Sequence, residues 1–240
     1  MPRRRAVNDI AAAFAAALAL IVGLDAQLAE IVLLSLRVTL SAVAVATLIG
    51  LPLGAALGAA RFPGRPVVVV AVNALMGLPP VVAGLLVYLL LSRSGPLGSL
   101  GLLFTPTAMV IAQTVLVTPI VIAVTRQVIE DLWAEYEEQL RSLGATPLRA
   151  VPTLLWDARF SLTTGVLAGF GRASAEVGAV LIVGGNIAGA TRTMTTAITL
   201  ETSRGDLPLA LGLGLILLGL TLAINAAAYA VGRLAHRWAG

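Results

Sequence analysis

The sequence predicts an all-α polytopic membrane protein with about six transmembrane helices, organised as one transmembrane domain over residues 1–240. Composition is the first support: 58% of the residues are hydrophobic and 12% are charged, whereas soluble proteins have roughly 25% charged residues. The second is the recurrence of apolar runs, since about 20 residues are enough to cross a bilayer core of about 30 Å. Five runs qualify within a core of residues 31–232, namely 31–60, 67–91, 103–125, 161–184 and 207–232.

A shorter apolar run, residues 10–24, precedes these five and follows the basic start MPRRR. This pattern fits a retained first span or a cleaved secretory signal peptide. We take it as a retained span, which makes six. Both alternatives deliver residues 25–30 to the outside as a tight loop.

Glycine and proline indicate how the spans pack and bend. Gly50, Gly54 and Gly58 recur every four residues in the run 31–60 and give one smooth helix face. Gly165 and Gly169 repeat this spacing in a later span. Small residues let helix backbones approach closely in lipid, so we expect both faces to be packing surfaces.

The connection RFPGRP (61–66) is a Pro/Gly turn that forces a helical hairpin. Pro79 and Pro80 follow Gly77 and remove two backbone donors within the run 67–91. We therefore expect a kink there. Such a kink is either a packing adjustment or a bend that lines a gate.

The arginines indicate orientation, since cytoplasmic loops of membrane proteins are rich in basic residues. With six spans and a cytoplasmic N-terminus, three arginines are outside: Arg93, Arg192 and Arg204. Eleven are inside: Arg3, Arg4, Arg5, Arg61, Arg65, Arg126, Arg141, Arg149, Arg159, Arg233 and Arg237. The sequence therefore predicts a multi-pass protein of the cytoplasmic (inner) membrane with both termini in the cytoplasm.

Composition also excludes several function classes. There is no cysteine and a single histidine, His236. Disulfides, His/Cys metal clusters and catalysis by a cysteine nucleophile are therefore excluded. The arginines form no patch with interleaved aromatic residues, which argues against a nucleic-acid partner.

The long inner connection, residues 130–158, carries an amphipathic helix. Apolar residues recur at spacings of three and four over 131–143. Gly144 is suited to end this helix, and Thr146 with Pro147 resembles the start of a second helix that runs to about Trp156. We expect the two helices to lie flat beneath the membrane. They either anchor the loop or, with an acidic rim (Glu135, Glu137, Glu138), dock a soluble partner.

The long outer connection, residues 185–206, is rich in groups that donate hydrogen bonds to a tetrahedral oxyanion. It contains Asn186, Arg192, Thr193 and five further threonines. Gly184 and Gly185 are placed to offer backbone N–H groups as an anion nest. Alternatively, residues 194–198 form a short re-entrant helix that closes the outer mouth or docks a receptor.

One ion pair is expected within the span 161–184. Arg172 and Glu176 lie four residues apart, one helical turn. A charged pair facing lipid costs several kcal/mol, so the two side chains face protein or a pathway. The pair either holds helices together or lies at a dimer seam or path, where Arg172 attracts an anion.

Several stretches resemble a known family. Glu138 followed six residues later by Gly144 is similar to the coupling-loop motif of ABC-importer permeases, although Gln139 and Leu140 replace two alanines and Trp156-Asp157 replaces a Leu-Pro pair. Residues 35–58, 73–114 and 169–211 resemble the permease subunits of tungstate ABC importers, relatives of molybdate and sulfate permeases. Together these three stretches cover a little under half of the chain.

The resemblance implies a type I ABC importer permease fold and a homodimeric channel. It also implies cytoplasmic ATPase subunits and an external oxyanion-binding protein as partners. Glu138, Gly144, Ala145 and Pro147 would couple to the ATPases through the loop 130–158. No cofactor is expected to bind directly, since ATP is used by the partner subunit and the chain has no Gly-Lys-Ser/Thr phosphate loop of its own.

Two function classes remain open at this stage. A transporter is favoured, with tungstate from the resemblance and molybdate or sulfate as alternatives that the residues themselves do not separate. An intramembrane enzyme or structural module is the other class. An enzyme would need a second acid or a nucleophile with its base, yet Glu176 is the one clear acid within a span.

Overall fold

The computed structural model describes residues 14–15, 17–19, 22–23 and 25–239. All regular elements of this described part are helices, as the predicted class requires. They are α2 (Ala26–Ala59), α3 (Arg65–Met76), α4 (Pro80–Leu91), the short 3-10 turn η1 (Gly98–Leu100), α5 (Pro106–Ser142), α6 (Pro147–Asp157), α7 (Arg159–Ser174), α8 (Gly178–Gly184), α9 (Met194–Arg204) and α10 (Leu207–Ala239). The predicted first span, residues 10–24, lies largely outside the described residues.

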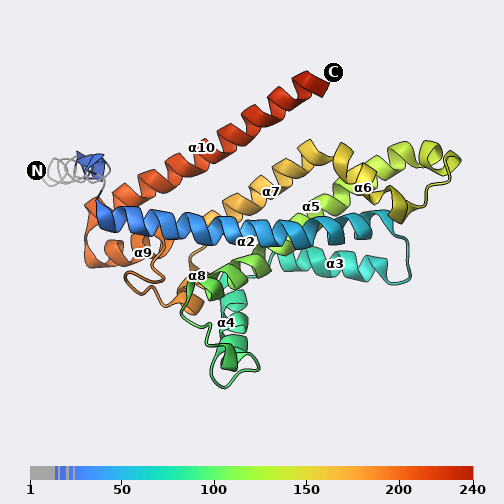
Figure 1. Cartoon of the computed structure of the whole chain (residues 1–240). Coiled ribbons are helices and arrows are strands. Elements are labelled where there is room, and N and C mark those ends of the chain that lie inside the picture. Colours follow the sequence, from blue (N-terminus) through green and yellow to red (C-terminus); the bar gives the residue numbers. More distant parts are fainter. Residues whose placement is uncertain (1–13, 16, 20–21, 24, 240) are drawn as a thin grey trace, which may run out of the picture.

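Three helical segments are long and apolar enough to cross a membrane alone: Ala26–Ala59, Pro106–Ser142 and Leu207–Ala227. Two bent pairs supply further candidate spans, with α3 and α4 at 101° and α7 and α8 at 59°. The described part therefore holds up to five spans, one for each of the five predicted apolar runs. In Figure 1, α2, α3, α5 and α7 follow the long axis, whereas α4 projects from it.

The first described span starts earlier than predicted. Asp25 caps α2, since its carboxylate accepts a hydrogen bond from the backbone N–H of Leu28 at 2.9 Å. The residues expected to form a tight outer loop, 25–30, are thus the cap and first turns of a helix. The side-chain acceptor of the aspartate satisfies one of the free N–H groups at the helix start.

The glycine face of α2 packs against α5, as predicted. A Cβ added at Gly50 would lie 2.7 Å from the Val121 side chain, and one at Gly54 would lie 2.6 Å from the Ile122 carbonyl oxygen. The glycines of α7 approach another part of α5: a Cβ at Gly165 would lie 2.6 Å from Val124. α5 is therefore the central helix, held between two glycine-bearing neighbours.

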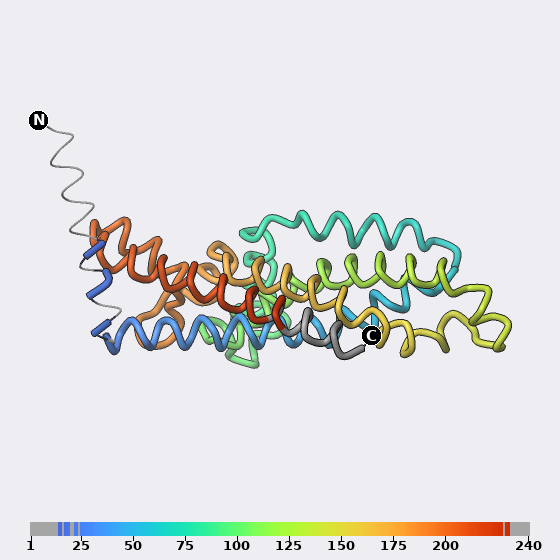
Figure 2. The backbone as a smooth tube through the Cα atoms, turned by 90° about the horizontal axis from the view of Figure 1, so that it is seen from above, coloured from blue at the N-terminus to red at the C-terminus, as the bar shows by residue number. Residues whose placement is uncertain are grey.

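The turn before α3 reverses the chain, and α3 then packs beside α5 (Figure 2). The predicted kink at Pro79 and Pro80 is a complete break, because α3 ends at Met76 and α4 starts at Pro80. The missing N–H groups of the two prolines leave no hydrogen-bond ladder to carry the helix through. α4 leaves at a wide angle and packs against α8 and α5.

The inner end differs from the expected arrangement. The amphipathic segment 131–143 is not a separate helix lying flat beneath the membrane, because α5 continues without interruption from Pro106 to Ser142. Pro119 is its one internal proline, and no glycine interrupts it. The segment thus continues the same helix as the predicted span 103–125. A buried cluster that includes Ile129, Trp133 and Leu154 joins α5 to α6.

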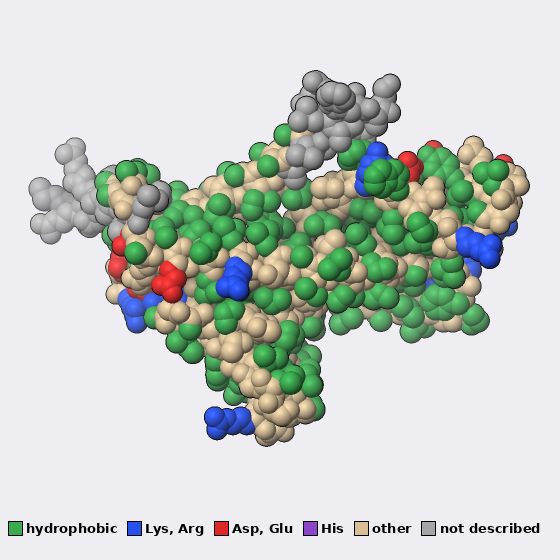
Figure 3. Space-filling view, in the orientation of Figure 1, with side chains coloured by type: hydrophobic (Ala, Val, Ile, Leu, Met, Phe, Trp, Pro, Cys, Tyr) green, Lys and Arg blue, Asp and Glu red, His purple; other side chains and the backbone are tan. Residues whose placement is uncertain are grey.

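On the face shown in Figure 3, hydrophobic side chains cover the flank, and most charged side chains gather at the two ends. Large apolar side chains such as Leu33, Leu48 and Val67 are 70% or more exposed. Monomeric soluble proteins rarely leave so much contiguous apolar surface uncovered. The surface therefore agrees with a polytopic membrane protein.

Candidate functional site

The break between α7 and α8 carries the ion pair predicted from the sequence. Arg172 Nη1 donates to Glu176 Oε2 at 2.7 Å, and Glu176 Oε1 accepts from the N–H of Ala179 at 2.9 Å. The Glu176 side chain is 2% exposed and that of Arg172 is 32% exposed. The carboxylate thus neutralises the arginine and caps the start of α8. The guanidinium group remains partly accessible.

The pair does not lie in the middle of one spanning helix, as the sequence suggested. α7 ends at Ser174, so Arg172 belongs to its last turn and Glu176 to the bend. The side chain of Glu176 competes for the α8 N–H groups, which favours starting a new helix over continuing the old one.

Neighbouring helices hold the bend in place. The Thr195 hydroxyl of α9 donates to the Glu176 carbonyl oxygen at 2.7 Å. The Gln113 amide of α5 donates to the Ala173 carbonyl oxygen at 3.1 Å. Both carbonyls lie where the helix ladder is interrupted. Thr195 supplies a donor to the Glu176 carbonyl, and Gln113 adds a donor to the Ala173 carbonyl, which also accepts from the Glu176 N–H at 3.2 Å.

The glycine pair after α8 ends that helix and forms no open anion nest at Gly185. The Gly185 N–H donates to the Leu181 carbonyl at 2.9 Å, and Gly185 adopts φ 72°. The Thr191 hydroxyl donates to the Gly184 carbonyl at 2.5 Å. Asn186 has φ 51°, and its amide donates to the Thr196 carbonyl at 3.5 Å.

Half of the outer connection is helical, because residues 194–204 form α9. Thr193 caps α9 in a reciprocal arrangement with Thr196, and the Met194 N–H donates to the Ser35 hydroxyl at 2.7 Å. The start of α9 is therefore fixed to α2.

Arg192 is already engaged by protein. Its guanidinium group lies 4.0 Å from the carboxylate of Glu201, which also pairs with Arg204 at 3.2 Å. The side chain of Glu201 is 7% exposed. The three side chains therefore tie the ends of the outer connection together, and because one carboxylate faces two arginines the cluster keeps a net positive charge, with Arg204 58% exposed.

A small pocket of about 20 Å³, partly open to solvent, lies beside the bend. Its polar lining comes from Ser35, Thr39, Gln113, Ser174, Glu176, Thr193, Thr195 and Thr221. Sequence reasoning missed Ser35, Thr39, Gln113 and Thr221. The available signal was a polar residue inside an apolar run. Gln113 is such a residue. In the structure it is 3% exposed, and its Oε1 has no hydrogen-bond partner among the described residues.

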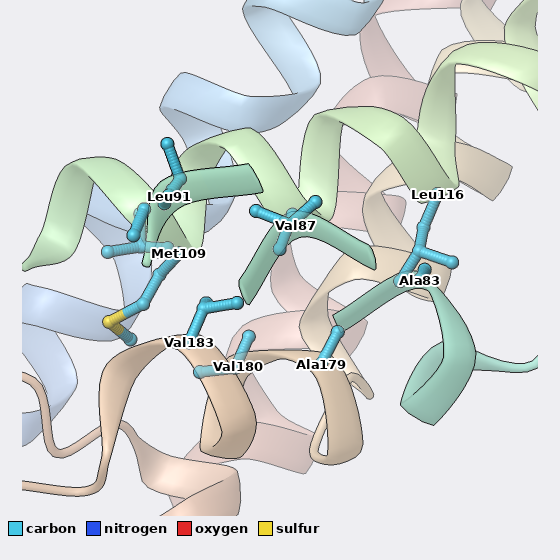
Figure 4. Close-up of a cluster of buried hydrophobic side chains, with 11 residues drawn as sticks. Ala83, Val87, Leu91, Met109, Leu116, Ala179, Val180 and Val183 are labelled. Atoms are coloured by element: carbon cyan, nitrogen blue, oxygen red, sulfur yellow. The ribbon is translucent and has the colours of Figure 1, made fainter. Parts of the chain in front are cut away.

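Pro79 and Pro80 lie outside this pocket and influence its surroundings through α4. A Cβ at Gly84 of α4 would lie 2.7 Å from the Ala179 Cα of α8. Figure 4 shows the buried cluster that fills this contact, with Ala83, Val87 and Leu91 facing Ala179, Val180 and Val183. The proline break therefore directs α4 onto the helix that Glu176 caps.

The residues expected to couple to a partner lie at the other end of the molecule, at the turn between α5 and α6. Gly144 has φ 75°, and the Ala145 N–H donates to the Leu140 carbonyl at 2.9 Å. α6 starts at Pro147 as predicted. Glu138 is exposed, and Leu143 and Leu148 are 82% and 59% exposed. The turn thus presents apolar and acidic side chains together.

Comparison with known proteins adds to this geometry. The family model described as "binding-protein-dependent transport system inner membrane component" matches residues 50–238. The chain is 41% identical over 222 residues to the tungstate uptake system permease protein TupB of Peptoclostridium acidaminophilum, covering 92% of this chain and 97% of that protein.

Two further relatives extend the comparison. The chain is 42% identical over 204 residues to a probable anion ABC transporter permease protein of Haloferax volcanii, covering 83% of this chain and 88% of that protein. It is 31% identical over 191 residues to the sulfate transport system permease protein CysW of Synechocystis sp., covering 77% of this chain and 69% of that protein.

Proposed function

Because the chain belongs to the family of binding-protein-dependent transport system inner membrane components, we propose that it forms the membrane path of an ABC importer for tungstate. The choice of tungstate as the substrate rests on the 41% identity to a tungstate uptake permease over 92% of the chain. Family membership makes the chain a transport subunit and removes the alternative of an intramembrane enzyme. The sulfate permeases, at about 31% identity, are the more distant comparison.

The arrangement of the chain supports this role. Arg172 is partly exposed, so its guanidinium N–H groups that do not contact Glu176 would donate hydrogen bonds to an anion on the path, and the pair leaves no buried charge unpaired. The hydroxyl-lined pocket next to it provides polar surface inside an apolar bundle. α8 and α9, which meet at Glu176 and Thr195, would form the outer gate.

The inner end would receive the ATPase subunits. The turn with Gly144, Ala145 and Pro147 exposes Leu143 and Leu148 beside acidic side chains such as Glu138. Exposed apolar groups with a polar rim are typical of protein interfaces. ATP binds to the partner subunit in this proposal.

We further place this end in the cytoplasm, because Arg61, Arg65, Arg126 and Arg141 gather there. The chain would act as a homodimer in the inner membrane. An external oxyanion-binding protein would deliver the substrate to the opposite end.

Uptake measurements test the proposal. Cells with and without this gene would receive tungstate, with molybdate or sulfate as competitors, and cell-associated tungsten would be measured by mass spectrometry. We expect tungstate uptake to be lost without the gene and restored by the intact gene. Equal uptake in both strains would refute the proposal. Loss of molybdate or sulfate uptake alone would keep the transporter class and replace the substrate.

A further inference from the structure

The helix α3 packs beside α5 without a buried side chain of its own. Its Val68 and Val72 line an apolar hollow shared with Leu53 of α2 and Ile122 of α5. None of its twelve residues is buried, and Val67 and Val70 are 72% and 66% exposed. α3 nevertheless leads directly into α4, which packs tightly on α8 at Gly84 and Ala179. Whatever fixes α3 to its neighbours therefore contributes to the position of α4, together with the direct contacts of α4 with α8 and α5.

A single carboxylate joins the start of α3 to α5. Glu130 of α5 accepts from the guanidinium group of Arg65 through Oε1 and from Arg126 Nη1 through Oε2 at 2.6 Å. The Nε of Arg65 donates to the Leu57 carbonyl oxygen of α2 at 3.0 Å. Arg65 and Glu130 are each 26% exposed and Arg126 is 13% exposed. The cluster therefore links the end of α2, the start of α3 and the middle of α5.

Glu130 also lies beside the part of α5 that packs against α6. Its neighbours Ile129 and Trp133 belong to the buried cluster that holds Leu154 of α6. Glu130 precedes Ser142, the last residue of α5, by twelve residues, or about 18 Å at 1.5 Å per residue, and the turn at Gly144 follows directly after the helix. A displacement of α6 thus reaches Glu130 through buried apolar contacts and one continuous helix.

We propose that Glu130 is a positioning residue of the transport cycle, which makes α3 and α4 follow α5 when the ATPase subunits move α6. This inference rests on the proposed function. It adds a route by which movement at the turn between α5 and α6 reaches the outer gate formed by α8 and α9. An isolated, partly exposed ion pair contributes little to stability. Here the carboxylate holds two arginines, and α3 has no buried side chain to replace that link.

The route has four steps, each resting on a contact of the described residues. α6 packs on α5 at Trp133, and α5 holds α3 through Glu130 and Arg65. α3 continues into α4 across the proline break, and α4 packs on α8 at Ala179. α8 starts at the bend that Glu176 caps. Loss of the second step would leave α6 and the bend intact and weaken the connection between their movements, because only the direct contacts of α5 with α4 and α8 would remain.

The experiment compares Glu130→Gln with Glu135→Gln in the complete importer, with its ATPase subunits and binding protein, in proteoliposomes. Glu135 is exposed on the same helix and belongs to no ion pair of the described residues. The readout is tungstate transported per ATP hydrolysed. We expect this ratio to fall at least fivefold in Glu130→Gln, with ATP hydrolysis retained, and to stay at the wild-type value in Glu135→Gln.

Two results would overturn the proposal: an unchanged ratio in Glu130→Gln, or transport and hydrolysis falling together, as a purely structural role requires. If Glu130→Gln does not assemble, Arg65→Gln removes the same link from α3 and keeps the pair of Glu130 with Arg126. The same loss of coupling is expected, and an unchanged ratio in this variant also overturns the proposal.

A second measurement separates this inference from the proposed substrate. The sequence has no cysteine, so Val70→Cys on α3 and Ala134→Cys on α5 can carry spin labels at exposed positions. We expect the distance between the labels within one chain to stay constant between nucleotide-free and ATP-bound states, and to change in Glu130→Gln. A distance that varies equally in both proteins overturns the inference. Absent tungstate transport by the wild-type importer would instead overturn the proposed function.

Discussion

Replacing Gly54 with alanine places a methyl group in the closest contact between α2 and α5. The added Cβ would lie 2.6 Å from the Ile122 carbonyl oxygen and 2.6 Å from the Thr125 Cβ, whereas ordinary contacts begin at 3.4 Å. The carbonyl oxygen is backbone and cannot rotate away. The two helices must therefore separate locally by about 1 Å, and the neighbouring contact at Gly50 loosens with them.

The expected cost follows from two opposing effects. Overpacking a well-packed site costs about 1–3 kcal/mol, and the upper half applies because backbone must move. Alanine in a helix interior is favoured over glycine by about 0.5–1 kcal/mol. We expect a net loss of about 1–2 kcal/mol in the free energy of unfolding, equivalent to a decrease in Tm of about 2–8 °C for a chain of this length.

The assay is thermal unfolding of the purified protein in detergent, followed by circular dichroism at 222 nm. Gly214→Ala is the matched control, because Gly214 lies within α10 and an added Cβ there meets no heavy atom within 4 Å. We expect this control to be at least as stable as the wild type. A Gly54→Ala protein as stable as Gly214→Ala would refute the close α2–α5 contact.

Three further predictions concern the bend and the coupling turn. Glu176→Gln removes the counter-charge of Arg172, which is one-third exposed. We expect the free energy of unfolding to fall by about 1–3 kcal/mol. Thermal unfolding measures this loss, and an unchanged Tm would contradict it. Thr195→Val leaves the Glu176 carbonyl oxygen without its donor, so stability should fall by about 1–3 kcal/mol, whereas Thr195→Ser should keep the wild-type Tm. Gly144 and Gly64 both have a positive φ, and a Cβ added at either meets no heavy atom within 4 Å. Alanine at either position therefore strains the backbone alone and lowers the free energy of unfolding by about 1–2 kcal/mol. Coupled tungstate uptake should fall only in Gly144→Ala, and equal uptake by the two variants would count against a coupling role.

Local chemistry made much of the fold predictable. The spacing of Gly50, Gly54 and Gly58 states directly that one side of a helix carries no side chains, and the structure places α5 against it. Gly144 and Pro147 are likewise interpretable alone, since a left-handed residue ends one helix and a proline suits the first position of the next. The continuity of α5 was overlooked, although the segment between the span and residue 131 contains no proline or glycine.

The bend at Glu176 was not predictable from its own neighbourhood. No proline lies near it, and Arg172 and Glu176 at a spacing of four suit a continuous helix. Two of the hydrogen bonds that hold it come from Gln113 and Thr195, which lie in other helices. The pocket was missed for the same reason, because its hydroxyl groups are dispersed over apolar runs that meet only in the folded bundle.

The length of α5 has a consequence for which sequence changes this chain tolerates. The helix is about 55 Å long at 1.5 Å per residue, and each residue turns it by 100°. One residue inserted after Glu130 would therefore rotate Trp133 away from Leu154 while leaving the glycine contacts near Thr125 in phase. Insertions and deletions in homologous chains should accordingly avoid the helix and fall in the turn at residues 143–146. An extra residue in the turn does not rotate the side chains of α5 relative to one another.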